Sequence, residues 1–231
     1  MRIVATSDTH YPPFVKRFDT FMNPVWDPTH VPIPDGDVFV HAGDLLRMGY
    51  PNEWDPALEW LARLPHKHKY FIPGNHDFHL QVYPGPALQQ MRQAGVTVIG
   101  LPGNDHYASV KLPNGMSMLG LPYVHTMGRW AFSCTKEELL AHLRKVWVAD
   151  EHDIVVSHMP VWGFLDQTLQ DVSTGSRIYR DFLNVKKPKV WICGHMHEGY
   201  GSVEHNGTML YNVAMCNRDY KHANPPMIIE V

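Results

Sequence analysis

The sequence predicts an α/β sandwich formed by a single domain over residues 1–231. Short runs rich in β-branched and aromatic residues alternate with segments of helical periodicity, which is typical of strand–helix–strand units. The dipeptides Asn114-Gly115 and Asn206-Gly207 indicate two β-hairpins later in the chain, so an all-parallel sheet is not expected. No internal repeat, low-complexity tract or linker divides the chain.

The expected strands are short and largely apolar, as central strands of a covered sheet are. They cover residues 2–7, 37–41, 69–72, 97–100, 153–157, 189–193 and 227–231. The two hairpins should pair residues 106–112 with 116–121, and 202–205 with 208–213.

Four helices are expected between the strands. They cover residues 56–64, 86–94, 136–149 and 178–185. Thr135 and Glu138 have the spacing of a capping box at the start of the third helix. Asp55 is expected as the N-cap of the first helix, with Pro56 at its first helical position.

The segment Tyr11–Gly36 is expected to be a long loop, because it holds six prolines and shows no clear periodicity. A loop of that length inside a compact domain is usually functional or mobile. Its aromatic residues could cover a bound nucleobase or pack onto the core, and the sequence leaves both open. These residues are Phe14, Phe18, Phe21 and Trp26.

Composition narrows the class of protein. The chain is 44% hydrophobic and only 19% charged, so a packed core is expected rather than disorder. A net charge of −3 without any Lys/Arg run disfavours a nucleic-acid polymer as partner. No window is long and apolar enough for a membrane span, and the N-terminus lacks a signal-peptide pattern.

Cysteine usage points to a reducing compartment. Cys134, Cys193 and Cys216 are odd in number and widely spaced, without a CxxC pair. We therefore expect three buried free thiols in a cytoplasmic protein, and neither disulfides nor thiolate metal ligands.

Five polar motifs directly follow predicted strands. They are Asp8-Thr9-His10, Gly43-Asp44, Gly74-Asn75-His76-Asp77, His158 and Gly194-His195-Met196-His197. Each motif alone is weak evidence, but the carboxyl ends of strands converge at one edge of an α/β sheet. The three glycines are expected to permit sharp turns there. The motifs together therefore predict one site.

The donor types of this site indicate metal binding. Carboxylate, amide and imidazole donors without thiolate suit Zn, Mn, Fe or Co. Seven ligands are too many for one four-coordinate ion, but they suit two ions that share a bridging carboxylate. The proposed ligands are Asp8, His10, Asp44, Asn75, His158, His195 and His197.

The ordered motifs resemble those of the calcineurin-like metallophosphoesterase superfamily, and they span residues 8–197. The resemblance is stronger to one subgroup, the brain metallophosphoesterase-domain proteins and their microbial relatives. Three stretches carry it, together with Asn224-Pro225-Pro226 near the end of the chain. The stretches are residues 65–77, 158–166 and 194–201. The Tyr11–Gly36 loop is longer than that subgroup usually shows. The resemblance implies a four-layer α/β/β/α sandwich with mixed sheets.

Carried over residue by residue, the resemblance implies a division of the ligands between two ions. Asp8, His10 and His197 would bind one ion, and Asn75, His158 and His195 the other, with Asp44 as the bridge. His76 would not bind metal. It would stabilise charge on the phosphate or protonate the leaving oxygen, oriented by Asp77.

The activity implied is hydrolysis of small phosphoesters, foremost phosphodiesters such as cyclic nucleotides, by in-line attack of a hydroxide held between the ions. A broad phosphomonoesterase is the main alternative. A non-catalytic metal-binding scaffold and a DNA nuclease are further alternatives, which intact ligands and the acidic net charge disfavour. The sequence determines neither the metals nor the oligomeric state.

Other residues near the motifs are open to two interpretations. Arg47, Arg129 and Arg177 could contact phosphate or be solvated surface residues. Gly199, in the turn Glu198-Gly199-Tyr200, could admit substrate or simply form a tight turn. The remaining histidines are expected to be structural or exposed, with His79 and His125 as the foremost exceptions.

Overall fold

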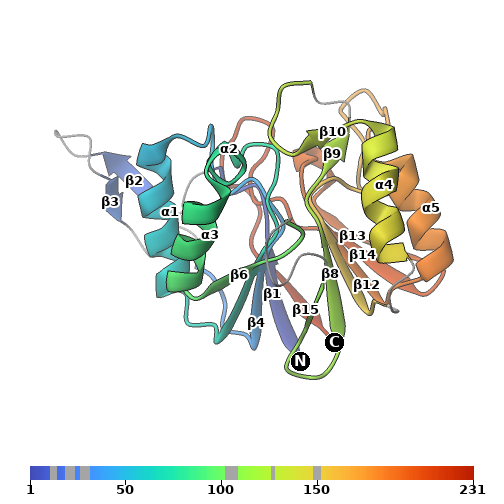
Figure 1. Ribbon diagram of the computed structural model, residues 1–231, viewed down its shortest axis with the longest axis horizontal. Coiled ribbons are helices and arrows are strands. Elements are labelled where there is room, and N and C mark those ends of the chain that lie inside the picture. Colours follow the sequence, from blue (N-terminus) through green and yellow to red (C-terminus); the bar gives the residue numbers. More distant parts are fainter. Residues whose placement is uncertain (11–14, 19–23, 27–31, 102–108, 126–127, 148–151) are drawn as a thin grey trace.

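Two β-sheets lie face to face, and helices cover the outer face of each (Figure 1). The computed structural model describes residues 1–10, 15–18, 24–26, 32–101, 109–125, 128–147 and 152–231. The arrangement confirms the predicted four-layer α/β/β/α sandwich with mixed sheets.

The first sheet has the strand order β15-β1-β4-β5-β6. Its strands are β1 (Arg2–Thr6), β4 (Val38–His41), β5 (His68–Phe71), β6 (Val96–Val98) and β15 (Met227–Glu230). β15 runs antiparallel to β1, whereas the other neighbours are parallel. β1 and β4 are buried almost throughout, as strands covered on both faces should be.

The second sheet has the order β13-β14-β12-β11-β8-β7. Its strands are β7 (Ser109–Lys111), β8 (Ser117–Leu121), β11 (Ile154–Ser157), β12 (Val190–Cys193), β13 (Gly201–His205) and β14 (Thr208–Asn212). The pairs β7–β8 and β13–β14 confirm both predicted hairpins. Residues 106–108, predicted to begin the first hairpin, lie outside the described residues.

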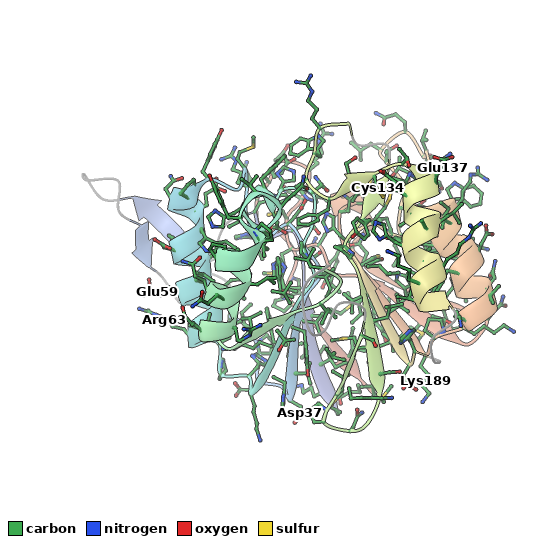
Figure 2. The ribbon with its side chains drawn as sticks, in the orientation of Figure 1. Asp37, Glu59, Arg63, Cys134, Glu137 and Lys189 are labelled. Atoms are coloured by element: carbon green, nitrogen blue, oxygen red, sulfur yellow. The ribbon has the colours of Figure 1, made fainter. Side chains whose placement is uncertain are left out.

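Three apolar clusters hold the layers together. The cluster between the sheets includes Ile3, Val40, Val156 and Ile192, all fully buried. A second packs the first sheet against α1 (Pro51–Arg63) and α3 (Pro84–Gln93), and a third packs the second sheet against α4 (Lys136–Trp147) and α5 (Arg177–Lys186). On the opposite side of α1, Glu59 and Arg63 form an ion pair in solvent (Figure 2).

The predicted start of the first helix is wrong. α1 begins at Pro51, so Asp55 lies inside it and Tyr50 is the N-cap. The Glu53 carboxylate explains the earlier start, because it accepts the backbone N–H groups of Arg47, Met48 and Gly49 at 2.9–3.1 Å. This contact fixes the preceding loop on the first turn of the helix. Proline at the first helical position costs no hydrogen bond there.

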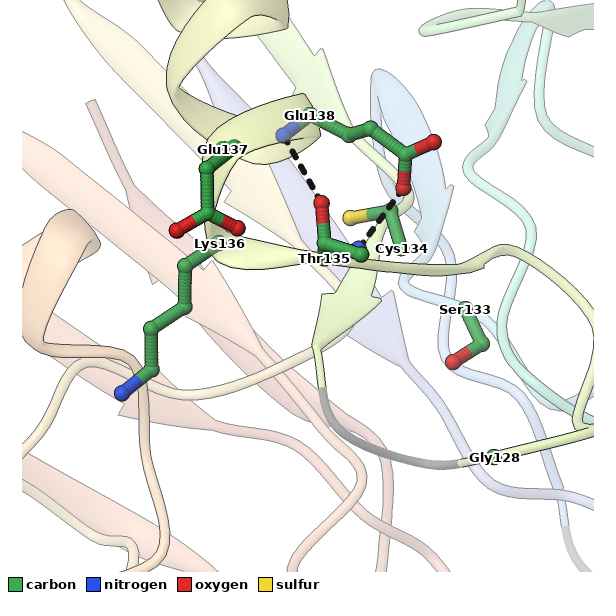
Figure 3. Close-up of a pocket in the computed structure, with 7 residues that line it drawn as sticks. All are labelled: Gly128, Ser133, Cys134, Thr135, Lys136, Glu137 and Glu138. Carbon is green, nitrogen blue, oxygen red and sulfur yellow. Dashed lines mark hydrogen bonds between the residues drawn. The ribbon is translucent and has the colours of Figure 1, made fainter.

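The start of α4 follows the prediction. Glu138 donates its backbone N–H to Thr135 Oγ1 at 3.1 Å, and its carboxylate accepts the Thr135 N–H at 2.8 Å (Figure 3). This reciprocal pair is the capping box read from the sequence. The short helix α2 (Phe78–Val82) and the strand pair β9 (Val124–His125) and β10 (Ser133–Cys134) were not predicted.

The prediction of a loop without regular structure over Tyr11–Gly36 is wrong for two short stretches. The segment contains the antiparallel strands β2 (Val15–Phe18) and β3 (Pro24–Trp26), which Figure 1 shows beyond α1. Phe14 and Phe21 lie outside the described residues. The hypothesis that this segment covers substrate therefore stays a prediction.

The cysteines are free. Cys193 and Cys216 are buried as expected, but Cys134 is partly exposed beside the start of α4 (Figure 3). In the part of the chain that the structure describes, no helix is both long and apolar enough to span a bilayer.

Candidate metal centre

The five motifs meet where the carboxyl ends of the two sheets adjoin. β1, β4 and β5 deliver Asp8, Asp44 and Asn75 from the first sheet, and β11 and β12 deliver His158 and His195 from the second. A bridge between Ser7 and Ala214 joins the sheets at this edge. The convergence predicted from strand ends is therefore found.

One group of donors consists of Asp8, His10 and His197. His10 Nε2 lies 3.0 Å from His197 Nε2, and Asp8 Oδ1 lies 3.4 Å from His197 Nε2 and 3.9 Å from His10 Nε2. Zinc and similar ions hold such ligands at about 2.0–2.2 Å. The group could therefore close on one ion with small adjustments.

A second group consists of Asp44, His158, His195 and Asn75. His158 Nε2 lies 3.3 Å from Asp44 Oδ2 and 3.0 Å from Asn75 Oδ1. Donor atoms of Asp44, His158 and His195 all lie within 4.8 Å of one another. This group has the composition that the sequence assigns to the second ion.

Asp44 lies between the two groups. Its Oδ1 accepts the backbone N–H of His76 at 2.8 Å, which fixes the carboxylate. Its Oδ2 then faces His158 at 3.3 Å and His10 at 3.8 Å. One oxygen is thus directed toward both groups, as a bridging ligand requires.

The main chain at the ligands adopts an unfavourable conformation. Asp8, His10, Asp44 and His195 have φ values of 51°, 46°, 56° and 67°, in the left-handed region that side chains rarely occupy. Such strain persists only where the surroundings fix it, and it concentrates at functional sites.

Two of the imidazoles are oriented by main-chain carbonyls. His158 Nδ1 donates to Ala42 O and His197 Nδ1 donates to Asn217 O, both at 2.8 Å. With the proton held on Nδ1, the Nε2 lone pair of each ring faces the cluster. This is the arrangement of metal-ligating histidines.

The contacts of Asp8 test whether a cation fits this site. Asp8 Oδ2 accepts the N–H of His195 at 2.8 Å and the Ser7 hydroxyl. Its Oδ1 is buried and has no hydrogen-bond partner among the described residues. A buried carboxylate oxygen without a partner is costly unless a cation neutralises it. The residues present therefore fit a pair of metal ions with oxygen and nitrogen ligands.

Comparison with known proteins agrees with this geometry. The family model described as calcineurin-like phosphoesterase matches residues 1–199. The chain belongs to the calcineurin-like phosphoesterase family. Metallophosphoesterase domain-containing protein 1 of Homo sapiens is 27% identical, over all of this chain and 71% of its own length. A UPF0046 protein of Caenorhabditis elegans is also 27% identical, over all of this chain and 75% of its own.

Solved structures share the fold at low identity. A phosphopantetheinyl hydrolase of Mycobacterium tuberculosis superposes with a TM-score of 0.61 at 14% identity, covering 94% of this chain and 90% of its own. A dimetal phosphatase of Danio rerio gives a TM-score of 0.55 at 14% identity, covering 92% and 86%.

Charge is distributed unevenly among the ligands of this calcineurin-like phosphoesterase. Burial opposes ionisation of Asp44, but the positive charge of His158 lowers the pKa of the Asp44 carboxyl well below its usual range. Burial lowers the pKa of His10 and of His195 to about 4, so both rings are neutral and ready to bind metal. Burial also acts against a charged His158, yet Asp44 raises its pKa to about 9. A metal would displace that proton.

The predicted orientation of His76 by Asp77 is wrong. His76 Nδ1 donates to the backbone carbonyl of Arg47, and its Nε2 lies 3.9 Å from Asp44 Oδ2. Asp77 instead accepts the backbone N–H groups of Gly74, Asp44 and Leu46 at 2.7–3.1 Å. It ties the loops after β4 and β5 together. Burial and the charge of Asp44 raise the pKa of Asp77 to about 7.

The glycines of the motifs leave space for the neighbouring metal-ligand side chains. Only Gly43 of the three has a left-handed φ, of +100°. A Cβ at Gly74 would overlap Asp44 Oδ1 and lie 2.7 Å from His158 Cε1. A Cβ at Gly194 would overlap Asp8 Oδ2. Turns do begin at Gly74 and Gly194, whose carbonyls accept the N–H groups of Asp77 at 3.2 Å and Met196 at 2.7 Å, so the expected turns are confirmed. The lack of a side chain at these two positions also admits the ligands.

The open end of the site is a cavity of about 260 Å³. Besides His10, Asp44, Asn75, His76, His195 and His197, four side chains line it that the sequence did not single out as substrate contacts. They are Trp130, Glu198, Arg218 and Tyr220. Arg218 and Tyr220 follow β14, whose parallel pairing with β12 brings its carboxyl end to the same edge. The position of Arg218 and Tyr220 shortly after a predicted strand was the sequence signal that could have identified them as lining residues.

The predicted phosphate contacts are not among the residues that line the cavity. Arg47 and Arg129 are exposed beside it, whereas the Arg177 guanidinium lies over the Trp162 ring, 4.0 Å from its centroid. Gly199 does not face substrate either, because a Cβ there would overlap the Leu165 carbonyl.

The two histidines singled out as exceptions do not line the cavity. His79 stacks on Trp54, with ring centroids 4.6 Å apart. His125 lies buried in β9.

Proposed function

We propose that this chain hydrolyses small phosphoesters, foremost phosphodiesters, with two divalent or trivalent metal ions. Asp8, His10 and His197 would hold one ion. Asn75, His158 and His195 would hold the other, with Asp44 shared. The observation that carries the proposal is the position of Asp44 Oδ2, which faces donors of both groups. Mn, Fe, Zn and Co all suit these ligands.

The family and the donor set support a hydrolytic role. When bound, such ions polarise a phosphoryl oxygen and lower the pKa of the attacking water. The chain's own contribution begins with His76, which the Arg47 carbonyl holds through Nδ1 so that Nε2 faces the cavity. From there Nε2 can donate to a phosphoryl oxygen or to the leaving oxygen.

One cationic side chain, beside the carboxylate of Glu198, lines the cavity and supports binding of an anion. Arg218 is the only Lys or Arg among the described residues that line the cavity. Its guanidinium can neutralise a phosphoryl oxygen, and it replaces the three arginines that the sequence suggested. The modest volume supports a small substrate rather than a polymer.

The site also supports treating residues 1–231 as one domain. Asp8, Asp44 and Asn75 follow strands of the first sheet, and His158 and His195 follow strands of the second. Neither sheet alone carries both groups of donors. We infer that the two sheets fold as one catalytic unit.

Metal analysis and a substrate panel test the proposal. Protein purified without added metal should retain close to two metal equivalents. With Mn²⁺ it should hydrolyse bis-p-nitrophenyl phosphate and cyclic nucleotides faster than p-nitrophenyl phosphate. His76→Ala should lose this activity, whereas His68→Ala, at the amino end of β5, should keep it.

Other outcomes separate the alternatives. Preference for p-nitrophenyl phosphate would indicate a phosphomonoesterase. Bound metal without turnover would indicate a scaffold. Robust cleavage of long DNA without turnover of small diesters would indicate a nuclease and would contradict the proposal.

A further inference from the structure

Two aromatic side chains at the cavity have no role in metal binding. The Trp130 ring lies 4.4 Å from the His76 ring between centroids, and the Tyr220 ring lies 4.6 Å from that of His10. Both rings line the cavity. They reach it from separate turns, one between β9 and β10 and one after β14. Aromatic surface is therefore presented to substrate from two independent segments.

Tyr220 is held at the surface rather than in the core. It is 47% exposed, and its backbone φ of 57° lies in the left-handed region. An aromatic residue is an outlier in that conformation, which glycine or asparagine adopts more readily. A strained, exposed ring beside ligands indicates a functional constraint.

The turn that carries Tyr220 is closed by hydrogen bonds and joined to a proposed ligand. Asn217 Oδ1 accepts the backbone N–H groups of Asp219 at 3.0 Å and Lys221 at 3.1 Å. The Asn217 carbonyl accepts both the N–H of Tyr220, at 2.9 Å, and Nδ1 of His197, at 2.8 Å. The position of the Tyr220 ring is thus linked to that of the His197 ring.

Trp130 is supported in a comparable way. Its ring also contacts Phe78, at 5.9 Å between centroids, and the N–H of the next residue, Ala131, donates to Asn75 O at 3.1 Å. The turn that carries Trp130 is therefore attached to the loop that holds Asn75 and His76.

We propose that Trp130 and Tyr220 form a leaving-group subsite that selects phosphoesters with a planar aromatic group over those with a small alkyl group. The inference rests on the proposed function, because it places the phosphoryl group at the metal centre. A planar group entering the cavity would stack on these rings, and their π-faces favour offset or edge-to-face contact. Such stacking tolerates different ring systems, so the subsite selects a class of substrate rather than one compound.

Binding of two phosphonates to the Mn²⁺-loaded protein tests the subsite without requiring turnover. Phenylphosphonate and methylphosphonate share the head group and differ only in the group that would occupy the subsite. Calorimetry on the wild type should show phenylphosphonate binding on the order of tenfold tighter. Tyr220→Asn removes the ring in a residue that tolerates the left-handed conformation, and it should reduce that ratio at least about threefold.

Matched variants isolate the effect of the rings. Trp130→Ala should also reduce the ratio, whereas Trp130→Phe and Tyr220→Phe should largely retain it. Affinity for methylphosphonate should change less than about twofold in every variant, because its head group binds the metals. Tyr83→Ala removes a ring that is 53% exposed and does not line the cavity, so it should change neither affinity.

The outcomes separate this inference from the proposed function. An unchanged ratio in Tyr220→Asn and Trp130→Ala, or no phosphonate binding, would overturn the subsite. The expected ratios without hydrolysis of any phosphoester would support the subsite and contradict the proposed catalysis. Hydrolysis that shows no preference between phenyl and methyl esters would leave the catalysis standing and remove the subsite.

Discussion

The two ends of the strands in this molecule differ in how their carboxylates are satisfied. At the amino ends, Asp153 accepts the N–H of Ser117 at 2.9 Å and pairs with Lys189 at 3.0 Å. Figure 2 shows Asp37 and Lys189 at this end, near solvent. At the carboxyl ends, buried carboxylates and imidazoles lie close together, and Asp8 Oδ1 has no hydrogen-bond partner in the part of the chain that the structure describes.

The difference indicates a division of labour. Paired carboxylates and tight hairpins at the amino ends stabilise the fold. The unpaired carboxylate oxygen of Asp8 and the left-handed backbone at the carboxyl ends lower the stability of the fold. We expect them to be retained because they serve metal binding. Substitutions at one end should therefore affect function, and substitutions at the other should affect the free energy of unfolding.

The largest effect is expected for Asp44→Asn. Because Asp44 faces both donor groups, the variant should lose metal from both sites and show no measurable turnover. His197→Ala should lose mainly one metal. Compared without metal, the variant should melt lower than the wild type, since the change leaves the buried positive charge of His158 without its carboxylate partner. Metal content and melting temperature check this, with exposed Asp181→Asn as control. Equal metal content in Asp44→Asn and wild type would refute the bridge.

The next effect is expected for His76→Ala. The ring is held by the Arg47 carbonyl and faces the cavity, so the variant should keep both metals. Turnover should fall by about 10²–10⁴-fold, the usual range for a positioned acid or base. Most of the loss should appear in kcat, because the contact is made in the transition state.

Leaving groups sharpen this test. If His76 donates a proton, esters of p-nitrophenol should lose less activity than alkyl esters, since p-nitrophenolate leaves without protonation. Equal losses would instead indicate charge stabilisation on phosphoryl oxygens. Loss of metal from the variant would contradict the placement of His76 outside the ligand set.

A smaller and mixed effect is expected for Asn212→Ala. Asn212 Nδ2 donates to the carbonyls of Leu165, Gly194 and Met196 at 2.8–3.4 Å, which fixes the loop that carries His195 and His197. The variant leaves these carbonyls without their donor, so the free energy of unfolding should fall by about 1–3 kcal/mol. Metal affinity should fall about 10–100-fold, as for other residues that orient ligands.

Denaturant unfolding and metal titration measure the two parts separately. Asn184→Ala, on the exposed face of α5, serves as the matched control and should change neither. If Asn212→Ala lost stability but bound metal as tightly as the wild type, the ligand loop would not depend on Asn212.

The smallest effect is expected for Asp153 at the amino ends. The N–H of Ser117, together with Lys189, lowers the pKa of the Asp153 carboxyl below its ordinary value of 3.8. The stability it contributes is therefore present above that value and is lost as the pH falls through the lower folded pKa. Asp153→Asn should destabilise the protein by about 1 kcal/mol at pH 7.

The pH dependence of unfolding checks whether the ionised Asp153 carboxylate stabilises the fold. The difference between Asp153→Asn and wild type should shrink as the pH is lowered below 3.8, and phosphoesterase activity at pH 7 should be unchanged. A constant difference across that range would show that packing, rather than the charge of Asp153, stabilises this end.

Most of the donor set could be predicted because it depends on local patterns. A polar residue directly after an apolar strand, as in Asp8 and Asp44, must lie at the carboxyl edge of a sheet. Asn-Gly dipeptides likewise fixed the hairpins at Asn114 and Asn206. In each case one short segment contains the whole signal.

The rest depends on contacts between distant segments. α1 starts early because Glu53 reaches back to the loop of residues 47–49. Asp77 orients backbone of a neighbouring loop instead of His76. Trp130 and Tyr220 have no distinguishing neighbours in the sequence, and their proximity exists only once two turns meet over the cavity.

The packing of the motif glycines has a consequence for metal selectivity. Asp44 and His158 lie against the main chain of Gly43 and Gly74, so neither side chain can move outward to make room for a larger ion. His197 is more accessible and hangs from a turn at the surface. We therefore expect a larger ion to shift His197 but not Asp44 or His158. Replacing zinc with the larger manganese ion should displace His197 and its turn and leave Asp44 and His158 in place. Because the Asn217 carbonyl links His197 to Tyr220, the position of the Tyr220 ring should depend on which metal is bound.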